Sequence, residues 1–282
     1  IAYGMKKGAS TIGNRVVSLE DAREMLLQHF DVDYHDRRII HELISSERYL
    51  ELVAASQITG KPRMGIDART GATGRGLCYG VLALIARLFL DGNWEPSDRL
   101  TADEIALLDA VSRINERLVL DKDGYDLLTN AQWRELDKSV FPKLLSGKKI
   151  IVQGTGKVGA SVLREFSRYG VNVVAVADAG GALIGDHLDT EEMLQAIAAS
   201  RLRSVIGAKQ GVSRTIIGAR EGSVILEVPC DILLPCALEN VIDGTMAGKL
   251  QAKMVACGGN GTNTSKAEDI LYRRGIAVLY DF

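Results

Sequence analysis

The pattern of apolar and polar positions is most regular in residues 148–178, KKIIVQGTGKVGASVLREFSRYGVNVVAVAD. The β-branched run Ile150–Val152 is typical of a parallel strand covered on both faces, and Asn172–Ala177 predicts a second strand that ends at Asp178. Between them, apolar residues recur at spacings of three and four: Val158, Val162, Phe166 and Tyr169. The segment therefore predicts a strand, a glycine turn, a helix and a second strand.

The same alternation continues to the end of the chain. Short apolar runs predict strands at 182–184, 223–226, 232–234, 253–257 and 276–280, and amphipathic stretches predict helices at 190–202 and 267–274. Strands that alternate with helices favour parallel pairing through right-handed crossovers. The predicted fold class is α/β, with a Rossmann-type doubly wound, mostly parallel sheet.

Two regions predict mainly helix. Residues 1–58 are expected to form a helical N-terminal segment or linker, with Ser18 as a helix N-cap. Residues 94–147 are expected to be a helical insertion within a nucleotide-binding domain spanning 59–282, and Thr101 with Glu104 forms a capping box there. Packing or subunit contact is the expected role of the insertion.

The glycine turn carries candidate chemistry. Gly154, Gly156 and Gly159 have the GxGxxG spacing, in which the first glycine permits a sharp turn, the second lets a pyrophosphate approach and the third lets helix pack on strand. The N-terminus of the following helix presents unpaired N–H groups to an anion. The strand, the glycine turn, the helix and the acidic residue after the second strand all match the pattern of a dinucleotide-binding unit. We therefore predict a dinucleotide site that includes the intervening Thr155, Lys157 and Val158.

Asp178 lies near the separation expected of a carboxylate that binds an adenosine ribose, although acids after strands also serve as helix caps or solubilising groups. Ala179 and the residues after it include no nearby arginine or lysine to neutralise a 2′-phosphate. This charge pattern favours NAD over NADP as cofactor.

Three further polar segments are candidates for ligand contact. Asn240 and Asn260 follow predicted strands, where ligands bind in open α/β sheets, and could hold a carboxamide; each could equally be a turn residue. Residues 59–76, TGKPRMGIDARTGATGRG, could cradle an anionic or polar ligand before a helix from Leu77, or could be a flexible linker. The sequence leaves these alternatives open.

Composition narrows the class of protein. With 282 residues, 46% hydrophobic, the chain can bury a sizeable core, and its net charge of −2 without a long basic run argues against nucleic acid as the main partner. Gly80–Leu90 is too short for a membrane span and contains Arg87, and no signal peptide is recognised at the N-terminus, so we expect a cytoplasmic protein without membrane contact. Beginning at Ile1, it is expected to be a piece of a longer chain.

Neither cysteines nor histidines indicate a metal site. The four cysteines lack zinc-site spacing and are expected to be buried reduced thiols: Cys78, Cys230, Cys236 and Cys257. Three of the histidines are six residues apart, which does not place them on one helical face: His29, His35 and His41. We predict no metal.

Ordered motifs across residues 59–282 resemble the cofactor domain of the glutamate/leucine/phenylalanine/valine dehydrogenase family. They are TGKP (59–62), RTGATGRG (69–76), VQGTGKVG (152–159), PCALEN (235–240), GGNGTNT (258–264) and GIAVLYD (275–281). The resemblance implies an oxidoreductase that oxidatively deaminates an amino acid, with glutamate dehydrogenase the nearest type, and a homo-oligomer in the full-length protein.

The resemblance also implies site roles. Thr155 to Gly159 would bind the pyrophosphate, Asp178 the adenosine ribose, and Cys236, Ala237 and Asn240 the nicotinamide half. Thr73 would border the nicotinamide and Asn260 the amino-acid substrate.

No GGxK-type motif, which carries the family's catalytic lysine, is recognised in this chain. The lysines in residues 1–76 are Lys6, Lys7 and Lys61, and none of them has that setting. We therefore assign no catalytic residue and expect this chain alone to bind NAD without turnover. The rival hypothesis is a non-catalytic NAD-sensing or assembly module with the same fold.

Overall fold

The computed structural model describes residues 9–12, 15–18, 71–112, 128–200 and 204–280. The chain divides into two compact units, residues 1–70 and 71–282. The predicted domain boundary at residue 58, the histidine triplet and the TGKP motif lie outside the described residues.

The described part of the first unit is a two-stranded antiparallel hairpin, β1 (Ala9–Ile12) and β2 (Arg15–Ser18). The prediction of a helical segment is therefore wrong for these residues. ASTI and RVVS are rich in β-branched side chains, which favour extended backbone over helix. Ser18 closes a strand, and the helix expected after it lies outside the described residues.

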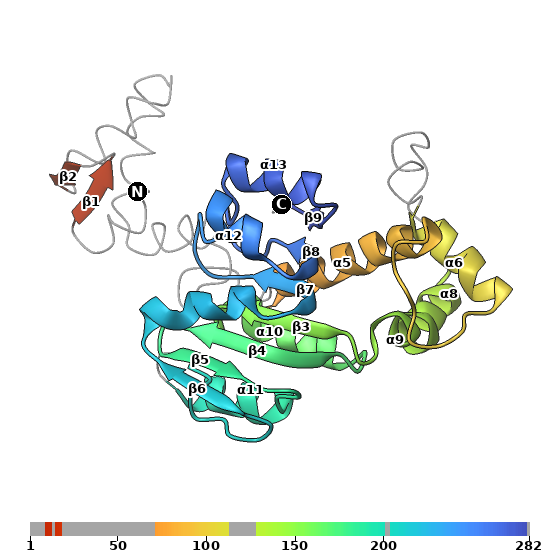
Figure 1. The fold of residues 1–282 in the computed structure, drawn as a ribbon, viewed down its shortest axis with the longest axis horizontal. Helices are drawn as coiled ribbons and strands as arrows, with labels where there is room; N and C mark the ends of the chain where they lie inside the picture. The colour runs from red at the N-terminus through yellow and green to blue at the C-terminus, as the bar shows by residue number, and fades with distance from the viewer. Residues whose placement is uncertain (1–8, 13–14, 19–70, 113–127, 201–203, 281–282) are drawn as a thin grey trace, which may run out of the picture. The chain divides into compact units, whose positions relative to one another are not determined.

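The second unit is built on a seven-stranded sheet with the order β6-β5-β4-β3-β7-β8-β9 (Figure 1). Its strands are β3 (Lys149–Gln153), β4 (Asn172–Asp178), β5 (Gly181–Ile184), β6 (Arg214–Ile217), β7 (Cys230–Pro235), β8 (Ala252–Ala256) and β9 (Ala277–Leu279). Pairing is parallel from β4 through β3, β7 and β8 to β9, whereas β5 and β6 add antiparallel strands at one edge. This is a Rossmann-like, mostly parallel α/β sheet, as predicted.

Helices cover both faces of the sheet. They are α5 (Ala72–Leu90), α6 (Ala102–Ser112), α8 (Asn130–Glu135), the π-helical turn η2 (Leu136–Val140), α9 (Phe141–Leu145), α10 (Lys157–Ser167), α11 (Thr190–Ala199), the 3₁₀ segment η3 (Ala219–Glu227), α12 (Gly244–Lys249) and α13 (Ser265–Arg273). Along β3, Ile150 and Val152 pack into the core beneath α5 and α10, and Ile151 packs into the core on the opposite face. This alternation explains why the strand is apolar at every central position.

In this unit one predicted strand is wrong and one strand was not predicted. Residues 223–226 lie in η3 and not in a strand, because Ile225 and Leu226 are both buried while Val224 is exposed, which is no strand alternation. The strand that pairs with β5 is instead β6, which the sequence analysis missed because only one of its residues, Ile216, is buried.

The helix expected from Leu77 begins at Ala72, after Gly71 at φ 80°. Gly74 lies where a Cβ would come within 2.8 Å of the Val158 carbonyl oxygen and the Ser161 Oγ, so α5 and α10 approach closely at this point. The glycines that suggested a loop are therefore helix-packing residues in part.

At 19 residues, α5 is longer than the apolar stretch Gly80–Leu90 considered in the sequence, and it is long and apolar enough to cross a membrane. Helices in the core of globular proteins pass the same test, and α5 places Leu77, Val81 and Ile85 in the hydrophobic core. We interpret α5 as a core helix.

The described part of the 94–147 region contains α6, α8, η2 and α9, whereas residues 94–101 lie outside any helix. Thr101 and Glu104 form the predicted capping box, with each backbone N–H bonded to the other side chain. Glu104 is buried and also receives hydrogen bonds from Lys143 and Ser139, both at 2.7 Å, which fasten α6 to the α8–α9 segment.

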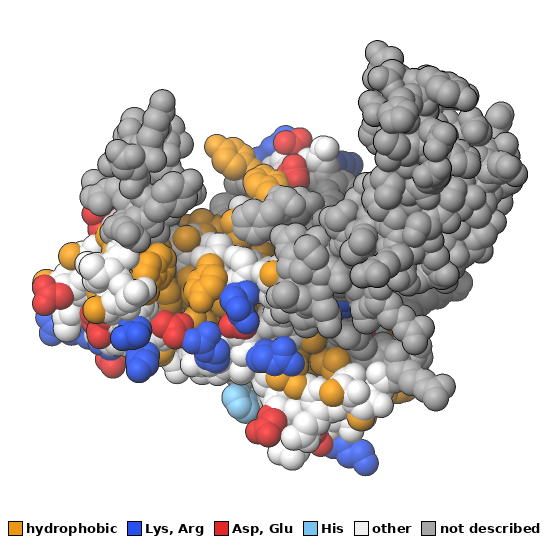
Figure 2. All heavy atoms as spheres, turned by 180° about the vertical axis from the view of Figure 1, so that it is seen from behind, with side chains coloured by type: hydrophobic (Ala, Val, Ile, Leu, Met, Phe, Trp, Pro, Cys, Tyr) orange, Lys and Arg blue, Asp and Glu red, His pale blue; other side chains and the backbone are white. Residues whose placement is uncertain are grey.

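On the described part of the face in Figure 2, basic and acidic side chains are interspersed with hydrophobic ones. Among the described residues, no group of His, Cys, Asp or Glu is arranged to hold a metal ion. All four cysteines are buried free thiols, as predicted.

Candidate dinucleotide site

The glycine turn joins β3 to α10, as the sequence predicted. Gly154 has φ 96°, and a Cβ there would lie 2.7 Å from the Ala237 Cβ. A Cβ on Gly159 would lie 1.7 Å from the Gly154 carbonyl oxygen, so only glycine allows the helix to start against the turn. At Gly156 a Cβ would meet nothing within 4 Å. The turn is thus tightly packed on its inner side and open at its middle glycine.

The N-terminus of α10 has no side-chain cap. Gly156 is the N-cap residue, and the first turn contains no acidic side chain. By contrast, α11, α12 and α13 are each capped by an Asp or Thr side chain: Asp189, Asp243 and Thr264. Exposed Gly156 and Lys157 therefore present backbone N–H groups without a partner among the described residues, the positive end of the helix and an ammonium group to an approaching phosphate.

The ends of neighbouring strands are tied together by backbone hydrogen bonds. Gly154 N–H donates to Ala177 O at 2.6 Å, and Cys236 N–H donates to Gln153 O at 2.7 Å. Gly258 N–H donates to Pro235 O at 2.9 Å. The loops after β3, β4, β7 and β8 consequently form one continuous edge, where open α/β sheets bind ligands.

Asp178 lies at the end of β4, as predicted, and its carboxylate is held by four donors of its own chain. Oδ1 accepts from Gly180 N–H at 2.6 Å and from Ser204 Oγ at 3.0 Å. Oδ2 accepts from Val205 N–H at 2.7 Å and from Thr155 Oγ1 at 3.3 Å. Ser204 is a site residue that sequence reasoning missed, because it lies 26 positions away and no local pattern marks it.

The candidates on the nicotinamide side come from three elements. Ala237 packs against Gly154, and the neighbouring thiol of Cys236 is buried, which raises its pKa to about 12 and keeps it protonated. Asn240 has φ 56° and its N–H donates to Gly261 O at 2.8 Å, so it is the turn residue that the alternative reading favoured, while its side chain stays exposed.

Asn260 is exposed in the loop after β8, and Thr73 is exposed in the first turn of α5. Ala179 is exposed beside Asp178. Within the described part of the chain the side chains of these three residues make no hydrogen bond or ion pair, so their roles stay predictions.

A dinucleotide fits these residues. The backbone N–H groups at the uncapped start of α10, beside the open position at Gly156, are donors for a polar ligand. The buried Oε1 of Gln153 is an acceptor, because it has no hydrogen-bond partner in the described part of the chain. Gln153 was not among the predicted site residues, although a polar side chain closing an apolar strand could have indicated it.

The profile of the Glutamate/Leucine/Phenylalanine/Valine dehydrogenase family matches residues 129–282. The chain belongs to this family. Its relatives include an NADP-specific glutamate dehydrogenase of Saccharolobus shibatae, 33% identical over 138 residues, which are 49% of this chain and 31% of that protein. A mitochondrial glutamate dehydrogenase of Dictyostelium discoideum is 28% identical over 227 residues, 79% of this chain and 35% of that protein.

Among solved structures, glutamate dehydrogenase of Plasmodium falciparum aligns with a TM-score of 0.51 at 17% identity, covering 86% of this chain and 42% of that one. At this identity the similarity concerns the fold. The chain spans about a third of the length of the curated relatives it matches. Relatives of this family are oxidoreductases, and the first of them is NADP-specific, so the preference for NAD stays a prediction.

Proposed function

We propose that this chain is the dinucleotide-binding part of an NAD-dependent amino-acid dehydrogenase whose substrate is L-glutamate. The observation that carries the proposal is the uncapped N-terminus of α10 behind an open glycine turn, in a chain of this dehydrogenase family. The glutamate dehydrogenases among its relatives favour glutamate over the other substrates in the family's name.

In this proposal, the chain's own groups bind and orient the cofactor. Backbone N–H groups from Thr155 to Gly159 and the Lys157 ammonium hold the pyrophosphate. Asp178 accepts hydrogen bonds from the adenosine ribose, while Ala237 and Asn240 lie along the nicotinamide half. Nicotinamide, when bound, accepts a hydride from the amino acid's α-carbon.

Groups that move protons on the substrate are proposed to come from another domain of the whole protein, because no catalytic residue is assigned in this chain. Thr73 and Asn260 are proposed to face the substrate from this side. The whole protein is proposed to be a cytoplasmic homo-oligomer without membrane or nucleic-acid partners, and domain limits of 59–282 are proposed for the cofactor-binding part.

Calorimetric titration of the chain with NAD and with NADP tests the proposal. We expect NAD to bind and Gly156→Ala to weaken it about tenfold or more, because the added methyl group projects where the phosphate approaches. Gly248→Ala is the matched control, since Gly248 also has no atom within 4 Å of an added Cβ. Both variants are expected to fold normally.

Tighter binding of NADP than of NAD would refute the cofactor choice. Equal binding by the two glycine variants would refute the site. If the chain binds NAD but gains no glutamate oxidation when joined to a lysine-bearing catalytic domain of the family, the NAD-sensing alternative is correct instead.

A further inference from the structure

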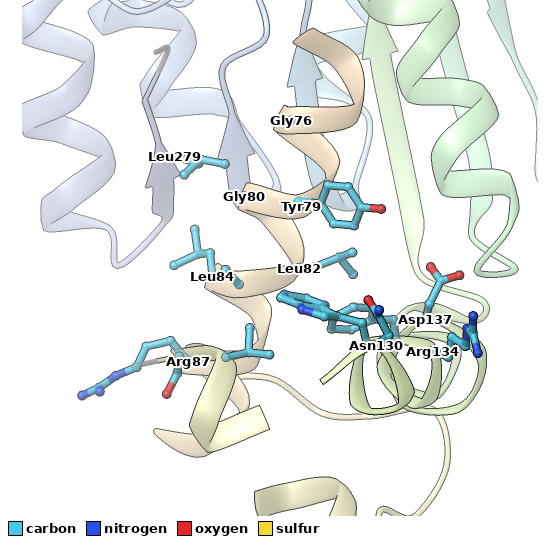
Figure 3. A pocket seen from close by; sticks show the side chains of 15 residues that line it. Gly76, Tyr79, Gly80, Leu82, Leu84, Arg87, Asn130, Arg134, Asp137 and Leu279 are labelled. Atoms are coloured by element: carbon cyan, nitrogen blue, oxygen red, sulfur yellow. The ribbon is translucent and has the colours of Figure 1, made fainter. Parts of the chain in front are cut away.

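A large cavity lies away from the strand ends, against the outer face of α5 (Figure 3). Its volume is about 980 Å³, and its walls come from α5, the end of α6, the α8–η2–α9 segment and Leu279 of β9. None of the predicted cofactor-binding residues lines it. A cavity of this size is at the upper end of the range found for small-molecule sites.

The walls are mainly apolar and aromatic. Leu82 and Phe141 are almost fully buried and belong to the core, so they form a fixed floor. Tyr79 and Trp133 also line the cavity but expose 46% and 38% of their surface. Large aromatic side chains left exposed around a hollow indicate a surface that gains free energy when an apolar ligand covers it.

Among the described residues, the charged groups that line the cavity are Arg87, Arg134 and Asp137. Asp137 is already bound, because it accepts from Tyr169 Oη at 2.6 Å and pairs with Arg168 at 2.5 Å. Arg87 pairs with Asp91 at 2.9 Å, and Figure 3 shows Arg87 on the side away from Arg134.

Arg134, by contrast, makes no ion pair or side-chain hydrogen bond within the described part of the chain. Asn130 lies one helical turn before it on α8, and Figure 3 shows both residues at the same end of the cavity. Of the described charged groups that line this cavity, the one without a described partner is therefore positive, and an amide lies beside it.

We propose that this cavity binds a small apolar monocarboxylate, with an alkyl or aryl body against Tyr79, Leu82 and Trp133 and its carboxylate toward Arg134 and Asn130. Guanidinium groups bind carboxylates with charge-assisted hydrogen bonds, and Asn130 supplies a second donor. The site is separate from the dinucleotide site and does not depend on the proposed function.

Octanoate is the probe, titrated into the 282-residue chain by calorimetry and followed by the fluorescence of Trp133. The other tryptophan, Trp94, is 5% exposed, and its indole N–H is bonded to Leu144 O, so its signal is expected to stay constant. Octanol and octylamine serve as neutral and cationic probes of the same chain length.

We expect saturable octanoate binding that Arg134→Gln weakens about tenfold, as the loss of a charge-assisted contact implies. Ala83→Phe fills the cavity from α5 and is expected to abolish binding. Arg164→Gln, at an exposed arginine of α10 that does not line the cavity, is the matched control.

Octanol or octylamine binding as well as octanoate would overturn the proposal, and so would an unchanged affinity in Arg134→Gln. Absence of saturation would also overturn it, and concentration-dependent self-association in sedimentation would then identify this face as a contact between copies. Titration of the Ala83→Phe variant with NAD tests whether the two sites are independent. We expect its affinity for NAD to equal that of the unchanged chain.

Discussion

Removing the hydroxyl of Ser204 should strengthen binding of the adenosine ribose. A carboxylate offers about four lone-pair positions, and four donors of the chain already occupy those of Asp178. A ribose diol must therefore displace a donor before it can bind. The two backbone donors are the shortest, at 2.6 and 2.7 Å, whereas the hydroxyls of Ser204 and Thr155 lie at 3.0 and 3.3 Å and can rotate away.

The size of the effect follows from the value of the bond that must be broken. A hydrogen bond to a charged group contributes about 1.5–3 kcal/mol, but Ser204 and Asp178 are only half-buried, so water recovers part of that value. A net gain of about 1 kcal/mol remains in Ser204→Ala, which corresponds to a roughly fivefold lower Kd for NAD.

Calorimetric titration with NAD, ADP-ribose and nicotinamide mononucleotide checks the reasoning. The gain should appear for the two ligands that carry the adenosine ribose and not for the mononucleotide. Ser213→Ala is the control, because Ser213 Oγ donates to Ile184 O at 3.0 Å outside this loop. An unchanged or weaker affinity for NAD in Ser204→Ala would refute the view that Ser204 competes with the ribose.

Three further outcomes are expected. Burial alone would raise the pKa of Glu104, but hydrogen bonds from Lys143, Thr101 and Ser139 lower it to about 2. The ionised Glu104 carboxylate therefore contributes its full stabilisation of the fold above about pH 4.5, and this stabilisation is lost as the pH falls toward 2. Glu104→Gln should accordingly lower the free energy of unfolding by about 2–3 kcal/mol at pH 7 and by much less at pH 2 in urea titrations; equal losses at both pH values would contradict this. Gly159→Ala should destabilise the fold by several kcal/mol in the same assay, unlike Gly156→Ala, because its Cβ would overlap a carbonyl oxygen. Burial raises the pKa of the thiols of Cys78, Cys230 and Cys236 to about 12. A thiol reagent at pH 8 should therefore react with them only after unfolding, and rapid modification of the native chain would disprove their burial.

The sequence predicted the parts of the fold that depend on local pattern. The β3–α10–β4 unit was predicted correctly because apolar period and glycine spacing are set within about thirty residues. The edge strand β6 was not predicted because it has a single buried residue. The 3₁₀ segment η3 was not predicted because it is buried by contacts with β4 and β5 that the sequence does not reveal.

The site shows the same division. Glycine positions in the turn follow from backbone geometry that any chain must obey, so they could be predicted. That Ser204 and Val205 reach Asp178 depends on how the chain returns after α11, and no residue type marks it. For this reason the Asp178 carboxylate was predicted as a ligand-binding group, whereas the structure shows that it also accepts hydrogen bonds from its own chain.

The contact between Gly154 and Ala237 has a consequence for variation in this protein. The loops after β3 and β7 meet there, and a methyl group added at Gly154 would overlap the Ala237 Cβ, so the bend that faces the phosphates keeps its shape only while position 154 carries no side chain. Because Gly154 also has φ 96°, a smaller residue at position 237 would remove the overlap but not the backbone strain, so position 154 is expected to remain glycine whatever residue stands at 237.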